Sequence, residues 1–242
     1  MGTPSSQQPH HSPSASPTAG FTYPFHADSW ETTLFIGTLL VITSLTIIPA
    51  IALLGYCWRV AAHAAHNHDP PTFSPWGRLL ANGLRGLVTA GVLAAGVCLF
   101  VGGPLTITRY LLTGYQPTTL SSLPALSSAA IVGVTTIGCW TYLLPAAFVH
   151  AATADDVTHG FSFQLLSTIV SPRYFLLWIL SMSAFTGMAF TSVLLALLPA
   201  VGTILSGFTS FYSLIAITGL FAFGLSPSLP TETRTTALNG FR

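Results

Sequence analysis

The stretch LFIGTLLVITSLTIIPAIALLGY, residues Leu34–Tyr56, contains no aspartate, glutamate, lysine, arginine or histidine. It is longer than the roughly 20 residues that a helix needs to cross the hydrocarbon core of a bilayer. A segment in lipid has to satisfy its own backbone hydrogen bonds, which a helix does and an open strand does not. We therefore expect Leu34–Tyr56 to be a transmembrane helix.

Four further apolar runs follow the first. They cover approximately Leu84–Val101, Ser127–Val149, Tyr174–Leu198 and Thr203–Leu225. Only Pro199–Gly202 separates the last two runs, and such a short connection predicts a tight helical hairpin. The sequence therefore predicts an all-α integral membrane protein with about five transmembrane helices.

The composition supports this class of protein. Only 5% of the 242 residues are Asp, Glu, Lys or Arg, and lysine is absent. Soluble domains carry roughly 25% charged residues, so this chain has too few charges to cover a surface that faces water. The net charge of +1 gives no argument for a nucleic-acid partner. Membrane lipids are the expected partners, together with a membrane-protein partner subunit.

The ends of the chain differ from its middle. Residues 1–20 are rich in Ser, Pro, Gln and His and have little to bury, so we expect a disordered polar tail. Residues 21–225 form the predicted polytopic helical membrane domain, and residues 226–242 form a short polar C-terminal tail.

The arginines predict an orientation in the cell membrane. With five spans, one side carries Arg59, Arg78, Arg85, Arg173, Arg234 and Arg242, and the other side carries only Arg109. Because positive residues concentrate on the cytoplasmic side, we expect a multi-pass protein whose N-terminus is outside and whose C-terminus is cytoplasmic.

Two segments on the predicted inner side have the pattern of amphipathic helices in the membrane interface. They are Phe73–Leu87 and His159–Phe175. Phe73-Ser74 and Arg85 precede Phe161-Ser162 and Arg173 by 88 residues, which suggests a weak tandem repeat. We expect these two helices to form the contact surface for lipid or partners, with Arg59, Trp76, Arg78, Arg85, Phe161 and Arg173 as its interface residues.

Most tryptophans and tyrosines lie close to predicted span ends. Because amphipathic rings prefer the depth of the lipid head groups, we expect them to be membrane anchors. They are Trp30, Tyr56, Trp58, Trp76, Tyr110, Trp140, Tyr142 and Tyr174.

The segment HAAHNHDPP, residues His63–Pro71, concentrates side chains that bind metals. His63 and His66 share one helix face, and His68 or Asp69 would complete a tetrahedral site for a divalent metal. Two other interpretations remain open. The segment is a pH-sensitive interface, or it is the polar end of a helix that leaves the membrane. No other cofactor is expected.

Catalytic motifs are missing from the sequence, which contains no GxSxG, HExxH or Walker lysine pattern. The carboxylate pair Asp155-Asp156 is typical of a helix-terminal charge or cap. The spans carry no ionisable residue in their interiors, which argues against a proton-coupled pump. We therefore expect a protein that is not an enzyme.

Several segments resemble one family of membrane proteins in order and spacing. They are Tyr23-Pro24, Asp28, Trp30, Ile36-Gly37, Pro49, Gly55-Tyr56, Arg59-Val60, then PPTFSPWGRLLANGL, YLLPAAFVHAA, FSF, YFLLWIL and LLALLPAVGTILSGFTSFYSLIA. Over roughly residues 21–225 the chain is similar to the polytopic membrane proteins called domain of unknown function 4013, which are abundant in halophilic archaea. The resemblance implies a polytopic helical fold, an archaeal source and no particular activity. Histidines replace the charged residues that the family usually has after the Gly-Tyr-x-x-Arg segment, and Gly219 lies where the family tends to place an arginine in the last helix.

Three functions fit these observations. The first is a non-enzymatic scaffold or accessory membrane subunit that contacts lipid or partners through its inner-face helices. The second is a transporter or permease-like protein for a small neutral or lipid-like solute, which a cavity between the two halves would support. The third is a metal- or pH-responsive sensor built on His63, His66 and His68.

Overall fold

The computed structural model describes residues 19–26, 29–113, 123–195, 197–198 and 201–226. Within these ranges every regular element is helical. Most of the predicted tail at residues 1–20 and nearly all of the C-terminal tail at 226–242 lie outside them. The elements, in chain order, are α1 (Ala19–Thr22), η1 (Tyr23–His26), α2 (Trp30–Ile42), α3 (Ile47–Ala65), α4 (Trp76–Val97), η2 (Cys98–Gly102), α5 (Gly103–Thr113), α6 (Leu123–Ala154), η3 (Val157–Phe161), α7 (Phe163–Ile169), α8 (Pro172–Leu195) and α9 (Val201–Leu225).

Five helical segments of the described chain are long and apolar enough to cross a membrane. They are Ile47–Ala65, Trp76–Leu111, Ala129–Ala154, Pro172–Leu195 and Val201–Leu225. The predicted all-α fold with five membrane-length helices is therefore confirmed. The last three helices lie close to the predicted runs. Helix α8 ends at Leu195 and α9 begins at Val201, and part of the predicted connection Pro199–Gly202 lies outside the described residues.

The boundaries predicted for the first span, Leu34–Tyr56, are wrong. The chain breaks at residues 43–46, between the 13-residue helix α2 and the helix α3. Three hydroxyl groups at the break bond backbone carbonyls: Thr43 to Leu39 at 2.7 Å, Ser44 to Val41 at 2.6 Å, and Thr46 to Thr43 at 2.8 Å. The same three carbonyls also accept backbone N–H groups, from Thr43, Ser44 and Thr46 at 3.0, 3.1 and 2.9 Å. The hydroxyl bonds therefore reinforce a turn whose backbone groups are already paired, and they satisfy the hydroxyls themselves in an apolar region. Pro49 lies in the first turn of α3, where its missing N–H costs nothing.

The second span is longer than predicted. Helix α4 begins at Trp76, continues through a short π-helical segment at Cys98–Gly102, and joins α5. The predicted interfacial helix Phe73–Leu87 is therefore not a separate element, because from Trp76 onward its residues form the first turns of α4. No proline interrupts the chain between Trp76 and Leu87, so the helix can continue into the span.

The second predicted interfacial helix does exist as a separate element. Helix α7 ends at Ile169, and α8 begins at Pro172. Proline has no N–H to donate to the preceding turn and disfavours a helical residue before it. The hydroxyl of Ser171 accepts a hydrogen bond from the backbone N–H of Tyr174 at 3.2 Å, so Ser171 caps the new helix.

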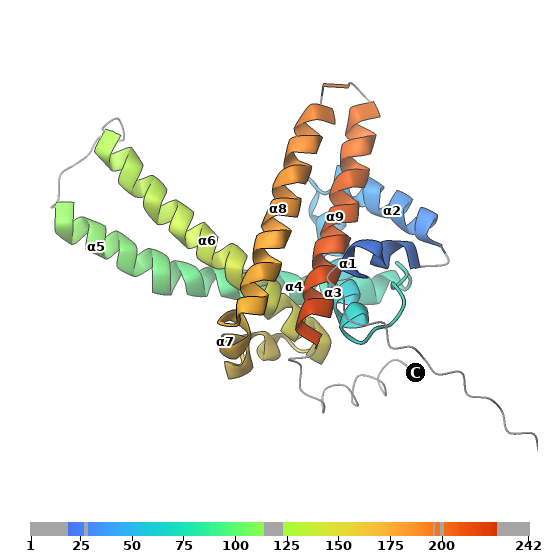
Figure 1. Cartoon of the computed structure of the whole chain (residues 1–242), viewed down its shortest axis with the longest axis horizontal. Helices are drawn as coiled ribbons and strands as arrows, with labels where there is room; N and C mark the ends of the chain where they lie inside the picture. Colours follow the sequence, from blue (N-terminus) through green and yellow to red (C-terminus); the bar gives the residue numbers. More distant parts are fainter. Residues whose placement is uncertain (1–18, 27–28, 114–122, 196, 199–200, 227–242) are drawn as a thin grey trace, which may run out of the picture.

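Two helical arms diverge from a common base (Figure 1). One arm is α5 with the adjoining half of α6, and the other is the α8–α9 hairpin. We define the base as the α3–α4 loop (residues 66–75) and the α6–α8 connection (residues 155–171), together with the first turns of α4 and α8. Helix α3 packs against α4, α6 and α9, so it joins the two arms.

Glycines allow α3 and α4 to approach until their backbones touch. A Cβ atom at Gly55 would overlap the carbonyl oxygen of Leu79, and one at Gly83 would overlap the carbonyl oxygen of Ile51. Small residues of this kind let membrane helices pack closely. The α3–α4 pair therefore depends on two positions that tolerate no side chain.

The prediction that the aromatic residues are membrane anchors is wrong for three that are buried near the base. Tyr56, Trp58 and Tyr174 are each at most 1% exposed. They lie where α3, α6, α8 and α9 converge, and Phe211 and Phe221 of α9 fill the same region. Trp76 is 49% exposed, which agrees with an anchor at the surface.

The residues before α2 pack against the base. The Tyr23 hydroxyl donates a hydrogen bond to the carbonyl oxygen of His68 in the α3–α4 loop at 3.1 Å. The Tyr23 ring also meets Phe223, near the end of α9, with 5.4 Å between ring centroids. Burial raises the pKa of Tyr23, so this hydroxyl stays protonated as a donor.

Candidate functional site at the base of the bundle

Helices α3 and α6 end in the same backbone motif, 88 residues apart. Asn67 has a φ of 56° and Asp155 a φ of 52°. Asp155 follows the last residue of α6 directly, and Asn67 follows α3 after the C-cap residue His66. The N–H of the next residue bonds the carbonyl five positions back, His68 to His63 at 2.9 Å and Asp156 to Ala151 at 3.2 Å. This pattern is the Schellman motif. The two motifs are 88 residues apart, which is the spacing of the predicted tandem repeat. The repeat is therefore visible in the backbone conformation at the ends of α3 and α6.

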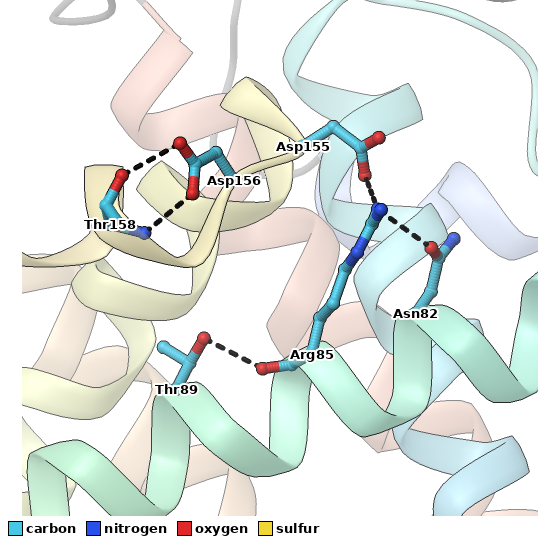
Figure 2. Close-up of polar contacts among 6 residues, drawn as sticks. All are labelled: Asn82, Arg85, Thr89, Asp155, Asp156 and Thr158. Carbon is cyan, nitrogen blue, oxygen red and sulfur yellow. Dashed lines mark hydrogen bonds and ion pairs between the residues drawn. The ribbon is translucent and has the colours of Figure 1, made fainter.

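Arg85 connects α4 to the α6–α8 connection (Figure 2). Its guanidinium forms an ion pair with Asp155 and a 3.5 Å hydrogen bond with the side-chain oxygen of Asn82. Both charged side chains are partly exposed, 43% for Arg85 and 67% for Asp155. Exposed pairs of this kind contribute about 0–1 kcal/mol, so the pair serves to align the two segments more than to stabilise them.

Asp156 organises the short helix η3 that follows. Its carboxylate accepts hydrogen bonds from the backbone N–H of Thr158 at 3.0 Å and from the Thr158 hydroxyl at 2.8 Å (Figure 2). These two bonds hold the pKa of Asp156 below its ordinary value. Asp156 therefore has the N-terminal capping role that the sequence predicts. The ion pair of Asp155 with Arg85 was not predicted.

Arg59 holds the α3–α4 loop in place. Its guanidinium donates to the carbonyl oxygens of Thr72 at 2.8 Å and Ser74 at 2.9 Å. The Tyr56 hydroxyl donates to the carbonyl oxygen of Pro71 at 3.1 Å. Arg59 was predicted as an interface residue, but its NH1 nitrogen is turned toward the loop backbone.

The predicted metal ligands lie at the end of α3, with His63 in its last turn and His66, His68 and Asp69 after it. The Nδ1 atoms of two histidines lie against backbone carbonyls, His63 at 3.1 Å from Asp69 and His66 at 2.7 Å from Ala62. The ring of His68 is 5.9 Å from that of His63 and 6.0 Å from that of His66, centroid to centroid. Across the described residues, no group of three or more His, Cys, Asp or Glu is placed to hold a metal ion. The site at His63, His66, His68 and Asp69 stays a prediction that the geometry does not support.

The remaining predicted interface residues lie at the base. Trp76 and Phe161 are 49% and 41% exposed, and Arg78 and Arg173 are also exposed. Arg78 and Arg173 form no ion pair within the described part of the chain. The structure thus brings these four residues to one end of the molecule.

Sequence reasoning missed which residues of α7 would be exposed. Phe163, Leu166 and Val170 are 90%, 54% and 80% exposed, while Leu165 and Thr168 of the same helix are buried. Val170 is the C-cap residue of α7. The spacing of three and four residues between the exposed positions was a signal for one shared face.

The fold and the base define an all-α integral membrane protein with five membrane-length helices and a short separate helix, α7, at one end. The family model for a protein of unknown function, DUF4013, matches residues 36–200. The match covers more than half of the chain, so the protein belongs to this family, as its sequence motifs indicate. No curated protein and no solved structure matches the chain.

Proposed function

We propose that the protein is a non-enzymatic membrane scaffold or accessory subunit of the cell membrane, and that its base is the contact surface for lipid or a partner. The observation that carries this proposal is the apolar face of α7, formed by Phe163, Leu166 and Val170. An exposed apolar helix face beside exposed arginines is typical of helices that lie in a membrane interface or dock a partner there.

The packing above the base supports the same proposal. Where the helices converge, Trp58, Tyr174 and Phe221 are at most 2% exposed and fill the interior. A filled bundle is what a scaffold requires, whereas a transporter requires a path between its halves.

The proposal includes an orientation. Arg78 and Arg173 lie at the base, and the guanidinium groups of Arg59 and Arg85 bond to its loops. Under the positive-inside rule these four arginines favour a cytoplasmic location for this end. Because Tyr23 contacts His68 at the same end, we also propose that residues 19–26 are on the cytoplasmic side. This differs from the outside location that the sequence predicts, and the reason is that α2 leads away from the base and α3 returns to it.

Native mass spectrometry of the protein, gently extracted from its own membranes, tests the proposed contact surface. We expect a partner subunit or a tightly held lipid in fixed stoichiometry. The double variant Phe163→Asp, Val170→Asp should lose it, because two charges then occupy the exposed face of α7.

Ser167→Asp is the matched control, because it adds a charge to the same helix at an exposed polar position. It should keep the bound component. A wild-type protein that carries neither lipid nor partner, or equal losses in both variants, would refute the proposal.

A further inference from the structure

A groove lies between α2 and the N-terminal half of α9, away from the base. Its volume is about 490 Å³, within the range of small-molecule sites. On α2 the lining residues Leu34, Thr38 and Ile42, together with Phe35 and Leu39, follow helical spacing, so they form one continuous stripe. Ile204 and Phe208 form the opposite wall on α9. The stripe from Glu31 to Ile42 is about 16 Å long, so the groove is elongated.

The walls of the groove offer no polar group to a solute. The Thr38 hydroxyl is the one polar side-chain atom between Leu34 and Ile42, and it donates to the carbonyl oxygen of Leu34 at 2.7 Å. A water-soluble molecule would therefore lose its hydrogen bonds on entry without regaining any. A hydrocarbon chain loses none, and an elongated apolar groove fits such a chain.

Glu31 and Trp30 line the groove at the first turn of α2, and their side chains carry polar groups of a kind that the rest of the groove lacks. Within the described residues Glu31 forms no ion pair. Trp30 is 38% exposed, and Phe25 packs edge-on against it with 5.6 Å between ring centroids. A carboxylate beside an exposed aromatic face is a set of groups that binds ammonium ions, through charge and through the cation–π interaction.

We propose that this groove binds one phospholipid whose head group carries an ammonium, with a hydrocarbon chain along the α2 stripe and the ammonium at Glu31 and Trp30. The charge of Glu31 selects against a lipid whose head is only anionic, since the like charges would repel each other. The site is separate from the α7 face and does not depend on the function proposed for it.

Lipid exchange followed by native mass spectrometry tests this site. The full-length protein is placed in nanodiscs that contain equal amounts of phosphatidylethanolamine and phosphatidylglycerol with the same acyl chains, and is then released into detergent. We expect one retained phosphatidylethanolamine per chain, at about a tenfold preference over phosphatidylglycerol. Glu31→Gln keeps the size of the side chain and removes its charge, so it should abolish the preference while a lipid is still retained.

Ile204→Trp fills the groove from the α9 wall, because Ile204 is 60% exposed and lines it. This variant should lose the retained lipid. Val193→Trp makes the same change at an exposed apolar position on α8, outside the groove, and should retain it. Melting temperatures of both variants show whether each is folded.

Several results would overturn the proposal. One is a wild-type protein that retains no lipid, and another is equal retention in Ile204→Trp and Val193→Trp. A preference for phosphatidylglycerol would show that Glu31 does not bind an ammonium head group. A dimer that only Ile204→Trp dissociates would show that a second copy of the chain occupies the groove. If Ile204→Trp does not fold, a fluorescence measurement replaces it. Bromine-labelled phosphatidylethanolamine should quench the fluorescence of Trp30, which is the difference in signal between the native protein and Trp30→Phe. The absence of this quenching would refute the site.

Discussion

The α3–loop–α4 segment and the α6–α8 segment begin alike and continue differently. Both start from a helix that ends in a Schellman motif, at Asn67 and at Asp155. After the first loop, α4 runs without a break through Leu84. In the second segment the position 88 residues later is Pro172, and here the chain forms two helices, α7 and α8. One residue type thus decides whether the amphipathic helix stays separate or becomes part of a span.

The two segments also differ in the contacts that hold their helices together. Gly55 and Gly83 bring α3 and α4 into backbone contact, and the positions 88 residues later are Leu143 and Ser171. In the second segment, aromatic side chains instead join α6 to the end of α7 and to α8. The Tyr142 hydroxyl donates to the carbonyl oxygen of Ile169 at 2.6 Å, and the Trp178 indole N–H donates to that of Thr141 at 3.3 Å. The first segment is a close-packed pair, and the second is held apart by large side chains.

Placing a proline at position 84 and removing the proline at position 172 tests this comparison most strongly. Leu84→Pro should destabilise the protein by about 3 kcal/mol, because a proline inside α4 removes a hydrogen bond and clashes with the preceding turn. Pro172→Leu should cost less than about 1 kcal/mol, since it removes a helix break and introduces none. Thermal unfolding in one detergent measures both. Equal losses would contradict the expectation that a residue other than proline is tolerated at position 172.

Gly55→Ala tests the backbone contact between α3 and α4. The added methyl group would overlap the carbonyl of Leu79, so we expect a loss of about 2 kcal/mol. Gly91→Ala in α4 is the matched control, because a Cβ there meets no atom within 4 Å. Its melting temperature should stay the same or rise slightly. A loss of equal size in the control would mean that glycine flexibility matters and close packing does not.

Tyr142→Phe tests the aromatic connection between α6 and the end of α7. The substitution keeps the ring and removes the donor to Ile169, so we expect a loss of about 1 kcal/mol. Hydrogen exchange should increase at α7 and the first turn of α8 and remain unchanged in α3. Increased exchange across the whole molecule would contradict a local role for this hydroxyl.

The ion pair between Arg85 and Asp155 should contribute little. A double-mutant cycle with Arg85→Ala and Asp155→Ala should give a coupling energy below about 1 kcal/mol, because both side chains are partly exposed. The coupling should fall as salt is added. A larger, salt-independent coupling would mean that the pair is shielded from solvent.

Asp156 should add a pH dependence confined to acid solution. The pKa of Asp156 in the folded protein lies below its ordinary value near 4. The stability that the charged carboxylate contributes is therefore fully present above the ordinary pKa, and it is lost as the pH falls through the folded-state pKa. The melting temperatures of the native protein and Asp156→Asn should therefore differ at pH 6 and converge near pH 2. A constant difference across this range would show that the Thr158 bonds do not lower the pKa.

Much of the fold is predictable from the sequence because continuous apolar runs mark α6, α8 and α9. The break after α2 was not predictable, since Thr43, Ser44 and Thr46 are tolerated inside a membrane helix and reveal the turn only through their bonds to backbone carbonyls. Burial of Tyr56 and Tyr174 was also missed. Both residues lie near the ends of apolar runs, and only the convergence of several helices covers them.

The candidate site was predictable in its residues but not in its contacts. Trp76, Arg78, Phe161 and Arg173 were expected on one face, and they lie there because loops and interfacial segments share the same end of the bundle. The pairing of Arg85 with Asp155 joins segments 70 residues apart. No local pattern encodes such a contact.

The continuous helix from Trp76 to Leu111 has 36 residues, which corresponds to a length of about 54 Å. A bilayer offers a hydrocarbon core of about 30 Å. This helix is therefore longer than the core is thick, so it extends beyond the core at its arginine-bearing ends or leans within it. The arm formed by α5 and α6 should lean further in thinner bilayers and stand more upright in thicker ones. The area that the protein occupies in the membrane plane would then change with bilayer thickness.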